Sequence, residues 1–85
     1  MIPKNLGELL TASAKKYPTR LAIVFGLKKI TYKTLNDLTD QIAAGLLKLG
    51  VKKEQKIAIF LDNCPEFVIS YYSILKAGAV VVPVN

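Results

Sequence analysis

Two groups of residues in this sequence have types and spacing that can support chemistry. Asp62, Asn63 and Cys64 follow an apolar run and precede a helical pattern, and Tyr71 and Tyr72 lie within that pattern. α/β proteins tend to bind ligands at the carboxyl ends of parallel strands, and a helix N-terminus there offers exposed amides. Asp62 and Asn63 are therefore candidate ligand contacts, although a turn and a helix cap is the more common use of such residues.

Cys64 and the two tyrosines also allow two interpretations. A thiol beside a helix N-terminus can be reactive, but a single cysteine is more often a small buried hydrophobe. Tyr71 and Tyr72 can line a pocket. Their helical spacing beside Phe67 and Val68 favours packing in a core or an interface instead.

Other residues that common catalytic sites require are missing. The chain has no histidine, which excludes histidine-based triads, general bases and metal sites. Its six Asp and Glu residues are spread out, with no convergent pair. Gly26, Gly45, Gly50 and Gly78 stand too far apart for a phosphate-binding loop. We therefore predict no catalytic, cofactor-binding or metal-binding residue in this chain.

The composition is that of a small globular domain. Eighty-five residues make at most one domain, and the apolar fraction of 52% is too high for a disordered tail. Lysines and turn residues interrupt every apolar run, so none approaches the roughly 20 residues that span a bilayer. One cysteine and no signal-peptide core suit a cytoplasmic protein. Peripheral membrane association of a larger parent protein stays open.

A net charge of +6 raises the question of nucleic-acid binding. The lysines, however, form small groups at predicted turns and element ends, and no element carries a basic stripe with interleaved aromatic residues. We therefore expect no nucleic-acid partner. The groups are Lys15-Lys16, Lys28-Lys29 and Lys52-Lys53 with Lys56.

The N-terminal part predicts a helix followed by a hairpin. Asn5 and Glu8 have the spacing of a capping box at the start of a helix over Asn5–Lys16. Two short β-prone runs around Gly26 then predict an antiparallel hairpin. Its strands are expected at Leu21–Phe25 and Lys29–Tyr32.

The clearest element is the amphipathic helix that follows. Thr31 is its expected N-cap, and Gly50 stands where a C′ glycine belongs. One face should cover a sheet while the other meets water. The apolar face is predicted to consist of Leu35, Leu38, Ile42, Ala43, Leu46 and Leu47.

The C-terminal part predicts a βαβ unit. Ile57–Leu61 and Val80–Val84 have the apolar runs of buried parallel strands. Asn63–Lys76 is the helix between them, with Asn63 as its cap and Glu66 placed to reciprocate. The crossover should be right-handed.

The predicted elements leave more apolar surface than they can cover. The polar stripe of the helix over Asn63–Lys76 is narrow, and a parallel sheet needs cover on both faces. The chain also ends on a strand that would normally feed another element. We expect a piece of a larger α/β protein. The alternative is a self-standing small α/β binding module of unknown ligand that hides this surface by oligomerising.

The stretch from Arg20 to Asn85 resembles the N-terminal region of adenylate-forming enzymes, the AMP-binding superfamily. That superfamily includes acyl-CoA synthetases, adenylation domains of peptide synthetases, and luciferases. The matching segments, in order and at similar spacing, are "ITYKTLN", "AAGLLKLGVKK", "KIAIFL" and "NCPEFVISYYSILKAGAVVVPVN". The last segment looks most like fatty-acyl and related aryl-CoA ligases.

The chain departs from the family pattern at three positions. Glu54-Gln55 stands where a Gly-Asp turn is common, Thr34 where a glutamate would complete a capping box, and Asp62 where proline is frequent. These departures concern turn geometry and cap strength.

The resemblance implies that residues 1–85 are the incomplete N-terminal portion of an AMP-binding large domain. Its parts would be an N-terminal helix (1–18), a hairpin plus helix (19–50) and a βαβ unit of a larger Rossmann-like sheet (51–85). The parent enzyme would use Mg-ATP to activate a carboxylic acid, and the likeness to fatty-acyl-CoA ligases implies that this is a fatty acid. It would release pyrophosphate and pass the acyl group to coenzyme A.

No position here matches the phosphate-binding loop, the nucleotide contacts or the catalytic lysine of the family. The resemblance therefore assigns no site residue to this chain and implies that this part alone binds no cofactor. Its expected partners are the remainder of the parent chain and, through exposed apolar surface, a second copy.

Overall fold

Residues 6–84 are described by the structure, a computed structural model, which has three helices and two pairs of strands within that range. The strands β1 and β2 pair antiparallel, and β3 and β4 pair parallel around α3. This confirms the predicted α/β fold, its hairpin and its parallel βαβ unit. The predicted cap Asn5 lies outside the described residues. The elements are α1 Leu6–Lys16, β1 Leu21–Phe25, β2 Lys28–Thr31, α2 Tyr32–Lys48, β3 Lys56–Ile59, α3 Pro65–Lys76 and β4 Val80–Pro83.

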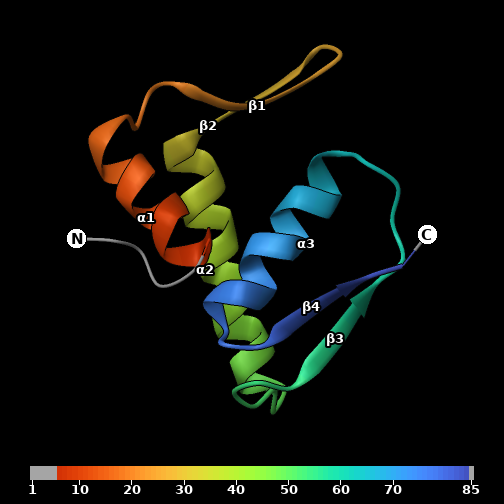
Figure 1. The fold of residues 1–85 in the computed structure, drawn as a ribbon. Helices are drawn as coiled ribbons and strands as arrows, with labels where there is room; N and C mark the ends of the chain where they lie inside the picture. Colours follow the sequence, from red (N-terminus) through yellow and green to blue (C-terminus); the bar gives the residue numbers. More distant parts are fainter. Residues whose placement is uncertain (1–5, 85) are drawn as a thin grey trace.

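The three helices pack on one another and separate the two strand pairs. Figure 1 shows the hairpin above the start of α2, and the β3–β4 pair on the other side of α3 near the end of α2. Ile59 of β3, Ile74 of α3 and Ala79, just before β4, form one small core. Leu10 and Leu35 are buried where α1 and α2 meet the hairpin end.

Helix α2 starts and stops where the sequence predicts. Thr31 accepts a hydrogen bond from the Thr34 backbone N–H at 3.2 Å, which is the N-cap interaction. At the other end, Gly50 has φ 98°, and Val51 N–H donates to the Leu46 carbonyl in a Schellman motif.

The predicted apolar face of α2 is partly wrong. Ile42 and Leu47 are 41% and 53% exposed, whereas Thr39 is fully buried. The Thr39 hydroxyl donates to the Leu35 carbonyl at 2.8 Å, so its burial leaves no unpaired polar group. A threonine whose hydroxyl donates to a carbonyl of its own helix can therefore be buried at the centre of a helix face, where periodicity predicts larger apolar residues.

The predicted cap of α3 is also wrong. The N-cap is Cys64, not Asn63, and it makes no side-chain cap hydrogen bond. Pro65 occupies the first helical position, where its fixed φ favours the helix and its missing N–H costs nothing. The proline therefore sets the start of α3, and the cap position falls on the residue before it.

The turn before β3 keeps a conformation suited to glycine. Glu54 has φ 67° and is the one described non-glycine residue in the left-handed region. Its backbone N–H donates to the Gly78 carbonyl at 2.8 Å, and the Gln55 side chain accepts from Lys52 N–H at 3.0 Å. The turn thus keeps this geometry without the glycine that is common in the family the sequence resembles, although a Cβ is sterically unfavourable in this region.

Replacing Glu54 with glycine should stabilise the chain by about 0.5–1 kcal/mol, because glycine adopts this conformation without strain. Urea unfolding measured by circular dichroism gives the change. The matched variant Glu54→Ala keeps the Cβ and should show no such gain. A gain of the same size in the alanine variant would mean that loss of the charge, not relief of strain, is responsible.

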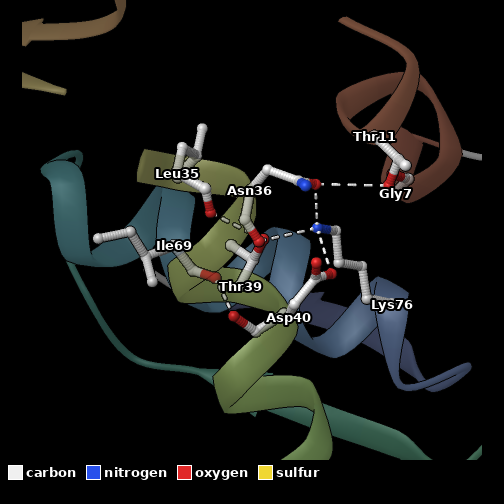
Figure 2. A network of polar contacts seen from close by, with 9 residues as sticks. Gly7, Thr11, Leu35, Asn36, Thr39, Asp40, Ile69 and Lys76 are labelled. Atoms are coloured by element: carbon white, nitrogen blue, oxygen red, sulfur yellow. Dashed lines mark hydrogen bonds and ion pairs between the residues drawn. The ribbon is translucent and has the colours of Figure 1, made fainter. Parts of the chain in front are cut away.

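A polar cluster joins the three helices. The Lys76 ammonium donates to the Asn36 side chain at 2.6 Å, to the Asn36 carbonyl at 3.2 Å and to Asp40 at 2.8 Å. Thr11 of α1 reaches the same Asn36 side-chain oxygen at 3.5 Å. Figure 2 shows these contacts converging from α1, α2 and α3. The Lys76 side chain is only 9% exposed, so the cluster lies inside the helix packing.

The apolar excess expected from the sequence is present. Phe60 is 74% exposed and Leu61 43%, just beyond the end of β3. They continue an open groove of about 390 Å³ along β3. The groove is lined by Ile42, Leu46, Ile57, Ala58, Ile59, Phe60, Leu61, Ser70, Ser73 and Ile74.

Candidate functional site

The residues that the sequence singles out lie around the start of α3, at the carboxyl end of β3. Asp62 and Asn63 are exposed in the connecting loop, and Cys64 is half-buried. Neither Asp62 nor Asn63 caps the helix. The structure thus places these three residues at the predicted edge of the βαβ unit, but their side chains do not form one site.

The positive end of α3 is occupied by a carboxylate from its own first turn. The pKa of Glu66 is held below the ordinary value of 4.5, first by a hydrogen bond from its own backbone N–H. The Cys64 thiol contributes a second hydrogen bond, and Lys28 of the hairpin forms an ion pair at 3.3 Å. Glu66 therefore already places a negative charge beside the positive end of α3, which makes this helix start less favourable for an anion.

An apolar hollow of about 320 Å³ lies between the hairpin and the start of α3. Cys64 contributes its thiol, and the other contacts come from carbon-rich side chains and Asn63. Such a lining can hold an apolar group but offers no general base. It comprises Ile23, Val24, Phe25, Asn63, Cys64, Pro65, Phe67 and Val68.

The rings of Tyr71 and Tyr72 meet edge to face at 6.1 Å, but the two side chains have different surroundings. Tyr71 packs against the core and lies 6.0 Å from the Phe67 ring, as the packing interpretation predicts. Tyr72 lines a second hollow of about 370 Å³ beside Tyr32, between α1 and the hairpin. Burial raises the pKa of the Tyr72 phenol, and the neighbouring Tyr32 and Tyr71 raise it further. The phenol therefore stays protonated at neutral pH and can donate a hydrogen bond, but it cannot act as a base.

Metal-ligating side chains do not gather among the described residues. Within residues 6–84 no group of three or more His, Cys, Asp or Glu side chains could hold a metal ion. Glu66 lies in the first turn of α3, the helix that follows β3. Separately, none of the helices in this range is long and apolar enough to cross a membrane.

Comparison with known proteins identifies relatives of this chain. The family model described as AMP-binding enzyme matches residues 10–85. A long-chain-fatty-acid–CoA ligase of Bacillus subtilis is 44% identical over 84 residues, and gramicidin S synthase 2 of Brevibacillus brevis is 37% identical over 82. Each alignment covers 96% of this chain, but only 15% of the first relative and 2% of the second.

Solved structures agree. The N-terminal subdomain of Klebsiella oxytoca NpsA superimposes with a TM-score of 0.91 at 32% identity, over 98% of this chain and 22% of that one. A fatty acyl CoA synthetase of Mycobacterium tuberculosis gives 0.88 at 34%, over 96% and 17%. The hairpin, the helix packing and the parallel βαβ unit are thus shared with much longer proteins. The chain belongs to the AMP-binding enzyme family.

Proposed function

We propose that this chain is the N-terminal part of an ATP-dependent, AMP-forming acyl-CoA synthetase that acts on fatty acids. The observation that carries the proposal is the 44% identity to a long-chain-fatty-acid–CoA ligase, against 37% for a peptide synthetase. The parent enzyme would join a carboxylic acid to AMP with release of pyrophosphate, and then transfer the acyl group to coenzyme A.

The role of residues 6–84 within that enzyme is architectural. The chain supplies a hairpin, three packed helices and a parallel strand pair. The open apolar groove along β3 would be covered by the rest of the parent. ATP, magnesium and coenzyme A would be held by the rest of the parent, and residues 6–84 contain no group of three or more His, Cys, Asp or Glu side chains that could hold a metal ion. We assign no catalytic residue to this chain, and we expect the parent to act in the cytoplasm.

The alternative is a self-standing oligomeric binding module, which the open groove along β3 favours. The two differ in solution. A module would elute from a sizing column as a defined oligomer, whereas an excised part would form no defined oligomer and would bind hydrophobic dyes through its open groove.

The function is tested with the protein encoded by the complete reading frame that contains this chain. We expect pyrophosphate exchange that depends on fatty acids, and acyl-CoA on addition of coenzyme A. The 85-residue chain, assayed in parallel, should release no pyrophosphate.

Two results would contradict the proposal. Exchange driven by amino acids, without thioester formation on coenzyme A, would place the parent among peptide synthetases. Pyrophosphate release by the 85-residue chain itself would show that the catalytic groups lie within these residues, against the architectural role.

A further inference from the structure

The tip of the β1–β2 hairpin carries Leu27, which packs on nothing, beside Val24 and Phe25, which also line the apolar hollow at the start of α3. Leu27 is 100% exposed, Val24 is 62% exposed and Phe25 is 51% exposed. Figure 1 shows the hairpin running from the start of α2 across the top of the view, above the start of α3, with the turn at its outer end. Three adjacent apolar side chains at the end of a hairpin differ from scattered surface leucines, which need no explanation.

The turn itself does not require leucine. Gly26 has φ 60° and Leu27 has no positive φ, which is the pattern of a two-residue turn with glycine at its first central position. A polar residue at position 27 would satisfy the same backbone. Because the Leu27 side chain is fully exposed, it contributes nothing to folding through burial within this chain.

Two lysines accompany the apolar cluster on the return strand. Lys28 pairs with Phe25 across the hairpin, and Lys29 pairs with Val24. Each face of the hairpin end therefore carries one apolar side chain beside one lysine, because cross-strand partners point to the same side. Lys28 also forms an exposed ion pair with Glu66 at 3.3 Å, so Lys29 is the lysine more available to a partner.

We propose that this tip, residues 24–29, docks on an anionic lipid surface. Apolar side chains at the end would enter the boundary between head groups and acyl chains, and the lysines would meet anionic head groups with their stems along the apolar layer. The charge pattern selects this occupant, since a purely apolar protein partner would gain nothing from the flanking lysines. The proposal goes beyond the enzymatic one and does not require it.

Vesicle sedimentation tests the docking, with phosphatidylcholine vesicles that contain or lack phosphatidylserine. We expect binding to the anionic vesicles that weakens as salt is added. Leu27→Asp should weaken binding at least roughly tenfold, because it removes the most exposed apolar group of the tip. Lys29→Gln should weaken it roughly fivefold.

The matched control is Phe60→Asp, which makes the same change of charge at an exposed aromatic residue near the groove along β3. This variant should bind the vesicles as well as the unsubstituted chain does. Equal binding to neutral vesicles, an unchanged affinity of Leu27→Asp, or an equal loss in Phe60→Asp would overturn the proposal. The proposal would also be overturned if the 85-residue chain bound the vesicles and the protein from the complete reading frame did not. The assay needs neither ATP nor acid, so its failure is distinct from failure of the proposed function.

Discussion

Replacing Leu35 with alanine should lower the free energy of unfolding by about 3 kcal/mol. Leu35 is 2% exposed and lies on α2, where α1 and the hairpin meet that helix. Cutting its side chain back to a methyl group removes apolar contacts and leaves space that the neighbours fill only in part. An 85-residue domain is stabilised by roughly 4–13 kcal/mol, so the expected loss is a large share of the total.

Urea unfolding followed by far-UV circular dichroism measures this effect. Leu27→Ala makes the same chemical change at a leucine that is 100% exposed, and it should leave stability unchanged. If both variants lost the same free energy of unfolding, burial of Leu35 on α2 would not be what stabilises the N-terminal half. A change in the slope with urea would point instead to an altered unfolded state.

The elements with strong local signals were predictable from the sequence. Thr31 and Gly50 bracket α2 as their residue types predict, because a hydroxyl cap and a left-handed glycine act through the backbone nearby. Gly26 likewise places the hairpin turn. These features depend on residues within one turn, which a linear pattern records.

Contacts between elements were not predictable in the same way. Lys76 resembles one more residue of a polar stripe, and Thr39 resembles an interruption of an apolar face. Both are largely buried, because α2 and α3 pack closely and each side chain finds acceptors there. The cap of α3 differs for a local reason, because Pro65 takes the first helical position and the cap therefore falls on Cys64 rather than Asn63.

Family membership could be predicted where substrate could not. A fatty-acid ligase and a peptide synthetase both align with 96% of this chain. The described residues are occupied with caps, turns and helix packing, which both kinds of relative need. Selection of the acid depends on side chains that contact it, and a fold that both kinds of relative share does not distinguish their acids.

Replacing Lys76 with methionine should destabilise the chain by about 2 kcal/mol. The methionine keeps an unbranched apolar stem but removes the ammonium, so the Asn36 side-chain oxygen keeps only the long 3.5 Å contact from Thr11, and the Asn36 carbonyl keeps the Thr39 hydroxyl. Losing hydrogen bonds from a charged donor costs about 1.5–3 kcal/mol. Asp40 is 59% exposed and turns to water, so it adds little to the loss.

Lys33→Met is the matched control, because the Lys33–Asp37 pair has the same 2.8 Å separation but both side chains are more than half exposed. It should change stability little. A double-mutant cycle with Asn36→Ala should give a coupling energy for Lys76 that is clearly above zero, since the two side chains meet at 2.6 Å. If Lys76→Met and Lys33→Met cost the same, the cluster would be an ordinary surface pair, and the three helices would be joined by apolar packing alone.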